Sequence, residues 1–238
     1  MSRVDVALLP EHLRESQRQN TLIVVDVLRA STTICAALDA MASDIHTVAT
    51  VGEARNIAKH SDCLLCGERE GIAPEGFVLG NSPREYIESI VKDQSLVFTT
   101  TNGTRALSLV ANEQTYIGAI TNRSAVCREA FGSHVTIVCA GTRGLVSLDD
   151  CIAAGLMIEW FVAHGYSQTE SVSLVCAATQ DCVTKHGSIY GALRSTMHGQ
   201  RLIELDMGAD IQYASMIDSS ECVPRFDPAT GKISHSMG

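Results

Sequence analysis

The sequence contains no uninterrupted apolar run of about 18 residues, so it predicts no transmembrane helix. Its first 20 residues contain neither a long apolar stretch nor a cleavage signal, which argues against a signal peptide. We therefore expect a cytoplasmic protein. Basic residues are few as well, since 18 Lys and Arg stand against 27 Asp and Glu. The resulting net charge of −9 argues against nucleic-acid and anionic-membrane partners, but a small phosphorylated substrate needs only a local cationic pocket.

Two common phosphate-binding signatures are also missing. The sequence has neither the P-loop pattern G-x-x-x-x-G-K-[ST] nor the dinucleotide-binding pattern G-x-G-x-x-G. Nine cysteines are scattered through apolar segments, and without an export signal we expect reduced, mostly buried thiols. Cys63 and Cys66 form a single C-x-x-C pair. A structural zinc site would need a second pair, so we interpret this one as part of a strand.

No Pro-rich or Gly-rich linker divides the chain, and short apolar runs alternate with helical patterns. This alternation predicts one three-layer α/β/α domain over residues 1–238, with helices on both faces of a mostly parallel, possibly mixed sheet. The segment after about 205 is weakly patterned, and we expect it to pack on the surface. The predicted strands are 4–9, 22–27, 45–49, 63–66, 96–100, 115–119, 135–139 and 172–177. The predicted helices are 32–42, 52–60, 83–92, 103–112, 122–131, 148–164 and 185–197.

Three of the predicted strands lead into similar loops. LRASTTI follows VVDV, NGTRAL follows VFTTT, and AGTRGL follows VTIVC. Each loop combines small or hydroxyl residues with an arginine before a helix, at the sheet edge where ligands of parallel sheets bind. Backbone N–H groups, hydroxyls and a guanidinium together suit an oxyanion. The alternative is that Ser31, Thr101 and Thr104 only cap helices.

Acidic residues occupy the same predicted edge. Asp26 ends the first of these strands, Glu68 lies in CGEREG, and Asp149 and Asp150 follow VSL. Carboxylates beside a phosphate pocket suit Mg²⁺, which binds one or two of them together with phosphate oxygens and water. Asp149 and Asp150 could instead complement a helix dipole, and Asp26 could pair with Arg29.

The ordered motifs VVDVLRASTTI, CGEREG, EGFVLGNSPREY, VFTTTNGTRAL and IVCAGTRGLVSLDDCIAAG resemble the 2-phosphosulfolactate phosphatase (ComB) family over roughly residues 4 to 195. The resemblance implies an α/β fold and Mg²⁺-dependent hydrolysis of 2-phosphosulfolactate to 3-sulfolactate and phosphate, a step towards coenzyme M. We predict catalytic roles for Asp26, Glu68, Asn102 and Thr104, and metal binding by Asp26, Glu68 and Asp149. The predicted substrate-binding residues are Arg29, Ser31, Thr32, Asn81, Thr100, Thr101, Gly103, Arg105, Gly141, Thr142 and Arg143.

Three other functions are alternatives to the phosphatase. A haloacid-dehalogenase-type enzyme needs a second acid two residues after Asp26, where Leu28 stands. An isochorismatase-like cysteine hydrolase could use Cys139, but no lysine lies in a suitable context to activate it. A non-catalytic binder of phosphorylated acids would have no use for the clustered acids. No histidine falls in a ligand spacing, so none is given a role. The expected partner is a small phosphorylated or sulfonated acid, and a homodimer is compatible with the sequence.

Overall fold

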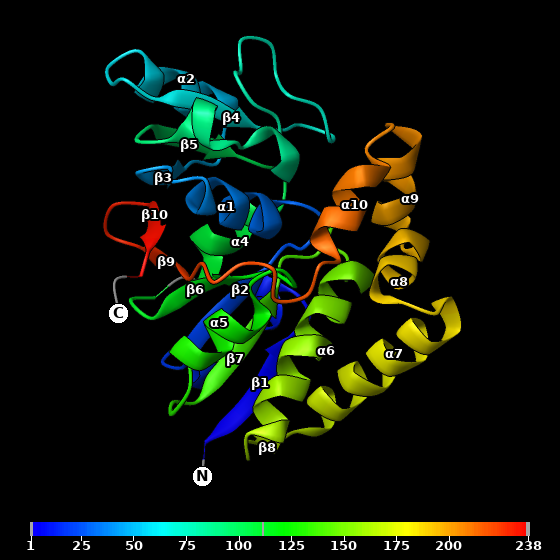
Figure 1. Ribbon diagram of the computed structural model, residues 1–238. Coiled ribbons are helices and arrows are strands. Elements are labelled where there is room, and N and C mark those ends of the chain that lie inside the picture. The colour runs from blue at the N-terminus through cyan, green and yellow to red at the C-terminus, as the bar shows by residue number, and fades with distance from the viewer. Residues whose placement is uncertain (1, 111, 237–238) are drawn as a thin grey trace.

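A computed structural model describes residues 2–110 and 112–236. Position 111 of the predicted helix 103–112 and positions 237–238 of the predicted C-terminal segment lie outside the described residues. Within these ranges ten strands form one sheet, in the order β4-β5-β3-β10-β9-β6-β2-β7-β1-β8. Helices cover both of its faces (Figure 1). The three-layer α/β/α prediction, with a mostly parallel mixed sheet, is therefore confirmed.

The bounds of the elements follow the predicted alternation along most of the chain. The strands are β1 (Arg3–Ala7), β2 (Thr21–Val25), β3 (Asp44–Thr47), β4 (Leu64–Gly67), β5 (Ser95–Thr99), β6 (Thr115–Gly118), β7 (Val135–Cys139), β8 (Ser167–Gln168), β9 (Pro224–Asp227) and β10 (Lys232–His235). The α-helices are α1 (Ala30–Asp39), α2 (Val51–Ala58), α3 (Glu88–Val91), α4 (Gly103–Val110), α5 (Arg123–Glu129), α6 (Leu148–Ala163), α7 (Glu170–His186), α8 (Ile189–Ser195), α9 (Met197–Glu204) and α10 (Gly208–Ala214). Short 3-10 turns lie at Pro10–His12, Glu15–Gln17 and Pro83–Glu85.

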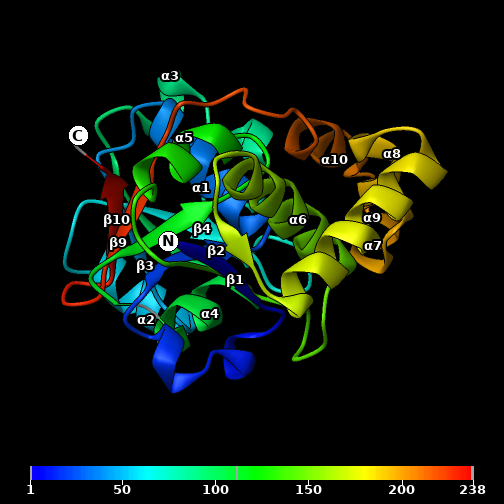
Figure 2. The same cartoon turned by 90° about the horizontal axis from the view of Figure 1, so that it is seen from below.

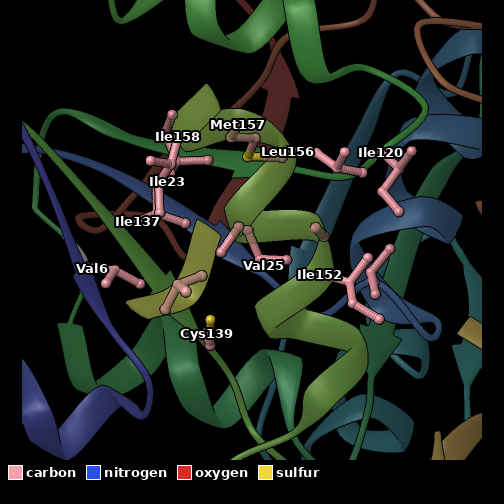
Figure 3. Packing of buried hydrophobic residues seen from close by; sticks show 14 of the residues in the cluster. Val6, Ile23, Val25, Ile120, Ile137, Cys139, Ile152, Leu156, Met157 and Ile158 are labelled. Atoms are coloured by element: carbon pink, nitrogen blue, oxygen red, sulfur yellow. The ribbon is translucent and has the colours of Figure 1, made fainter. Parts of the chain in front are cut away.

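The strand β2 shows why the sheet has two cores. All five of its residues are buried, and successive side chains of a strand point to opposite faces. Leu22 and Val24 belong to the core that also contains residues of α1 and α4. Ile23 and Val25 belong to the core beneath α5, α6 and α7, where Met157 of α6 packs near them (Figure 3). A continuous apolar run is therefore what a strand covered on both faces requires.

The sheet consists of two parallel sets of strands joined by an antiparallel hairpin. The strands β8, β1, β7, β2 and β6 are parallel to one another, and so are β3, β5 and β4. Between the sets lies the β9–β10 hairpin, which pairs antiparallel with β6 on one side and β3 on the other. Three successive antiparallel pairings separate β3 from β6, so the two sets run in opposite senses along the twisted sheet (Figure 1).

Two of the predictions for the second half of the chain are wrong. The segment after 205 does not merely pack on the surface, because β9 and β10 lie inside the sheet and bury Phe226 and Ile233. The predicted strand 172–177 lies within helix α7. Its buried positions include Val172, Val175 and Cys182, which is helical spacing, and a short apolar run cannot by itself distinguish a helix from a strand.

The helices α7 to α10 form a C-terminal helical arm over residues 170–214. The arm packs beside α6, with α7 against α6 and α8, α9 and α10 against one another (Figure 2). Among the helices described, none combines the length and apolar character needed to cross a bilayer.

Candidate active site

Asp26 lies at the centre of the candidate site. It follows β2 directly, and its side chain is buried. A Cβ atom built on Gly103 would lie 3.0 Å from Asp26 Oδ2 and 2.8 Å from Ala30 Cβ. The first turn of α4 therefore abuts the Asp26 carboxylate and the first turn of α1. This contact brings the loop after β5 to the loop after β2.

The environment of Asp26 makes its charged form costly. Burial raises the pKa of Asp26 to about 6. The charge of His198 acts against this rise, whereas the carboxylates of Asp149 and Glu68 add to it. Three acids thus influence one another inside the protein, and a nearby cation or proton stabilises such a group.

The hydroxyls that follow Asp26 brace its loop. Ser31 Oγ accepts a hydrogen bond of 2.8 Å from the Asp26 N–H, and Thr32 Oγ1 donates one of 2.8 Å to the Val27 carbonyl. Both residues are buried. These contacts hold the β2–α1 loop in shape, and direct substrate contact by Ser31 and Thr32 stays a prediction.

Asp150 ties the loop after β2 to the loop after β7. Its two carboxylate oxygens accept hydrogen bonds from the Val27 N–H at 3.0 Å and from the Gly141 N–H at 2.9 Å. Burial, followed by the charges of Asp149 and Asp26, raises the pKa of Asp150 well above its ordinary value. From the sequence, Asp150 is a candidate for the acidic cluster or for complementing a helix dipole, and nothing in the sequence shows that two loop N–H groups point at it.

Asp149 lies in the first turn of α6 and is also buried. The Ser147 hydroxyl donates to its Oδ1, and Nδ1 of His198 lies 3.6 Å from its Oδ2. Burial alone would lower the pKa of His198, but the neighbouring carboxylate of Asp149, followed by that of Asp26, raises it. No histidine receives a role from the sequence, but the structure places His198 beside Asp149 of the candidate site. This histidine comes from α9, in a part of the chain without a recognisable motif.

Glu68 joins the loops after β4 and β5. Its Oε1 accepts a hydrogen bond of 2.7 Å from the Thr101 N–H, and its Oε2 accepts one of 2.7 Å from the Gly71 N–H. Both oxygens of this buried carboxylate thus hold backbone groups in place. A catalytic or metal-binding role of Glu68 stays a prediction.

The TTTNGT loop caps α4 and contacts the neighbouring loop. The Thr104 N–H donates to Thr100 Oγ1 at 3.3 Å, and the Thr104 hydroxyl donates to the Thr100 carbonyl at 2.8 Å. Asn102 Oδ1 accepts a hydrogen bond of 3.1 Å from the Arg143 N–H, which links the loops after β5 and β7. The residue that accepts from the first turn of α4 is therefore Thr100 and not Thr101, which the capping alternative named, and the chemical roles of Thr100 and Thr104 stay predictions.

The AGTRGL loop makes a tight turn that requires glycine at its start. Gly141 has a φ of +68°, and a Cβ there would lie 2.6 Å from the Leu145 carbonyl oxygen. Thr142 and Leu145 exchange backbone hydrogen bonds of 2.8 and 3.0 Å. Gly141 is therefore needed for the turn that directs its own N–H at Asp150.

The three predicted anion-binding arginines lie in different surroundings. Arg29 is buried, and its guanidinium contacts Asp210 rather than Asp26, so the expected Asp26–Arg29 pair is wrong. Arg105 and Arg143 are exposed, and each pairs with a surface glutamate: Glu11 for Arg105 and Glu70, at 3.1 Å, for Arg143.

Asn81 is the remaining predicted binding residue. It is buried, and its backbone carbonyl accepts a hydrogen bond of 2.9 Å from the Thr33 hydroxyl. Its side-chain Oδ1 is buried without a hydrogen-bond partner among the described residues. Such an atom is uncommon in folded proteins and accepts readily from any donor that reaches it.

Comparisons with known proteins identify the family. A family model described as 2-phosphosulpholactate phosphatase matches residues 7–228. The chain belongs to this family. Three relatives bear the name "Probable 2-phosphosulfolactate phosphatase". The one from Pseudothermotoga lettingae is 35% identical over 94% of this chain and 95% of the relative. The one from Deinococcus radiodurans is 35% identical over 95% and 94%, and the one from Caldanaerobacter subterraneus subsp. tengcongensis is 37% identical over 87% and 88%.

The family match confirms the resemblance predicted from the motifs. The family name places its members among the phosphoric monoester hydrolases. It also argues against the cysteine-hydrolase alternative, and so does the structure. Cys139 is fully buried, and a hydrogen bond with Cys151, followed by burial, raises the pKa of its thiol well above the ordinary value. A nucleophilic cysteine needs access and a lowered pKa.

The oxygen ligands that the site's acids offer are chemically compatible with Mg²⁺, and binding of the ion stays a prediction. Within residues 2–110 and 112–236, no group of three or more His, Cys, Asp and Glu side chains is placed to hold a metal by itself. Asp26, Glu68 and Asp149 thus do not form a complete protein cage. Mg²⁺ usually takes one or two carboxylates and completes its shell with water and phosphate oxygens. Asp26 and Asp149, buried and electrostatically coupled, match that requirement better than Glu68, whose oxygens hold backbone N–H groups.

Proposed function

We propose that the protein is a Mg²⁺-dependent phosphatase that hydrolyses 2-phosphosulfolactate to 3-sulfolactate and phosphate. The observation that supports this most is that Asp26 and Asp149 are both buried and close enough for the charge of Asp149 to raise the pKa of Asp26. These two acids come from separate family motifs, and the match to the family spans residues 7–228. The proposal extends to the coenzyme M route that the family resemblance implies, and to a cytoplasmic location.

Asp26 and Asp149 are the residues that would hold Mg²⁺ in this proposal, and the ion would offset the charge of the phosphoryl oxygens. Asp150 and Glu68 hold the surrounding loops in place by accepting hydrogen bonds from their backbone N–H groups. The exposed guanidinium of Arg143 lies 3.1 Å from Glu70, which belongs to the loop that follows β4. We propose that Arg143 binds the sulfonate group of the substrate. This group stays charged at neutral pH and therefore needs a permanent cation.

Phosphate release from a panel of phosphorylated 2-hydroxy acids tests the proposed reaction. We expect release from 2-phosphosulfolactate with Mg²⁺, and weaker release from a phosphate ester that lacks the sulfonate. The physical reason is that a missing charge-assisted contact costs roughly 10- to 150-fold. Full activity in excess EDTA would refute the metal requirement, and no release from any member of the panel would refute the reaction.

Cys139→Ser should retain most of the phosphatase activity, within about fivefold. The buried thiol lies in the core, and serine changes one atom without removing a group from the proposed chemistry. Activity and thermal unfolding are measured on the same preparation. A folded but inactive Cys139→Ser variant, with a trapped covalent adduct in the wild type, would favour the cysteine hydrolase instead.

A further inference from the structure

Besides the approach of His198 to the candidate site, the C-terminal helical arm contacts this site through a buried ion pair between Arg29 and Asp210. Arg29 Nη1 lies 2.7 Å from Asp210 Oδ2, and each side chain is only 2% exposed. The other oxygen of Asp210 accepts a hydrogen bond of 2.6 Å from the Ser82 hydroxyl. The other terminal nitrogen of Arg29 donates to the Gly71 carbonyl at 2.9 Å. One ion pair thus connects α10 with the loops that follow β2 and β4.

The hydrogen bonds continue from this pair to a third loop. Gly71 accepts a hydrogen bond from Arg29 through its carbonyl oxygen and donates one to Glu68 through its N–H. Glu68 in turn accepts from the Thr101 N–H in the loop after β5. A continuous series of contacts therefore runs from Asp210 through Arg29, Gly71 and Glu68 to Thr101.

Stability alone is a poor explanation for such a pair. Removing two charges from water is costly, and a buried ion pair can often be replaced by apolar side chains without loss of stability. Unlike apolar side chains, a hydrogen-bonded ion pair fixes the relative positions of its partners, because a guanidinium holds them in one plane. Arg29 lies three residues after Asp26, so fixing Arg29 also fixes the loop that carries this carboxylate.

We propose that Asp210 is a positioning residue for the site: it holds Arg29, and Arg29 sets the β2–α1 loop against the Glu68 turn. The inference rests on the proposed phosphatase function. Because its guanidinium is buried and bonded to protein groups, Arg29 acts on the loops and not on the substrate. Loss of the pair therefore lowers kcat more than it raises KM.

The experiment compares three variants with the wild type on 2-phosphosulfolactate in Mg²⁺. Asp210→Asn removes the charge and should lower kcat about 10- to 100-fold with KM changed less than about threefold. The double variant Arg29→Met/Asp210→Leu replaces the pair by apolar side chains and should recover the wild-type Tm but not kcat. The matched control is Asp218→Asn, which breaks the Arg123–Asp218 pair in the same half of the chain and should leave kcat within about twofold.

Recovery of kcat together with Tm in the double variant would overturn the proposal, because the pair would then serve stability only. A rise in KM at unchanged kcat in Asp210→Asn would overturn it as well, since Arg29 would then bind substrate. If the double variant does not fold, Asp210→Glu decides. This variant keeps the charge but displaces it by one methylene, so a lower kcat supports positioning and an unchanged kcat refutes it.

A second readout separates this inference from the phosphatase proposal. If the wild type releases no phosphate, the proposed function fails, but hydrogen exchange at the Gly71 and Thr101 amides can still be followed by NMR. Faster exchange at both amides in Asp210→Asn, with no change in Asp218→Asn, supports the positioning role. Unchanged exchange at both amides refutes it.

Discussion

Asp26→Asn is expected to lower turnover by at least about 10²- to 10³-fold and, at the same time, to make the protein more stable at neutral pH. The amide has nearly the shape of the carboxylate but is a poor ligand for a hard cation. It also carries no charge, and the charge of Asp26 is what burial makes costly. Steady-state kinetics in Mg²⁺ and thermal unfolding without metal measure the two effects separately.

The sign of the stability effect follows from the pKa of Asp26. The value rises from 3.8 for an unperturbed carboxyl to about 6 in the folded protein. Between these pH values the folded state binds more protons than the unfolded state, so the free energy of unfolding falls as pH rises. Above pH 6 the ionised Asp26 carboxylate lowers the free energy of unfolding of the wild type by about 1–3 kcal/mol. The Asp26→Asn variant carries no charge at this position and avoids this cost.

The Tm of Asp26→Asn should therefore exceed that of the wild type at about pH 7.5 and match it near pH 4. Adding Mg²⁺ should raise the Tm of the wild type more than that of the variant, because ligand binding stabilises the folded state. Asp62→Asn, at an exposed position, is the control and should change neither activity nor Tm. An Asp26→Asn variant less stable than the wild type at neutral pH would contradict this account of the site.

Gly103→Ala has the second largest expected effect. The new Cβ would lie 2.8 Å from Ala30 Cβ and 3.0 Å from Asp26 Oδ2, and both distances are below ordinary contact. The first turns of α1 and α4 must then separate, which displaces the carboxylate. A shift of about 1 Å in a catalytic group can cost about 100-fold in rate. We expect a loss of kcat near that size and a lower Tm, although alanine is the better helix former.

Gly52→Ala provides the matched control for Gly103→Ala. Gly52 also lies in the first turn of a helix, α2, but its new Cβ would come no closer than 3.8 Å to Thr50 Oγ1. This variant should keep full activity and gain up to about 1 kcal/mol of stability. If Gly103→Ala and Gly52→Ala have the same kcat and Tm, the close contact between α4 and Asp26 does not affect catalysis.

The predicted elements agree with the structure where the sequence signal is local. The runs ending at Val25 and Cys139 form central parallel strands, and such strands are recognisable because both their faces are apolar. The run at 172–177 has the same composition but folds as a helix. Helix α7 packs against α6, α8 and β1, and these contacts depend on the tertiary fold.

The residues of the candidate site also fall into those that the sequence could predict and those that it could not. Asp26, Glu68 and the TTTNGT loop could be found because polar residues at strand ends are conspicuous against apolar strands. His198 and Asp210 could not, since they lie on short helices where a single charged residue is ordinary. Their partners, Asp149 and Arg29, are distant in sequence, so only the folded arm reveals the pairing.

The position of the β9–β10 hairpin has a consequence for biosynthesis. Residues 224–235 leave the ribosome after all the other strands, yet they occupy the middle of the sheet. Until then β3 and β6 are open edges, and exposed edges favour pairing with other chains. The two sets of parallel strands therefore remain separate and solvated in the nascent protein until β9 and β10 have been synthesised. Contacts this distant in sequence form slowly, so demand for chaperones should persist until the β9–β10 hairpin has been synthesised.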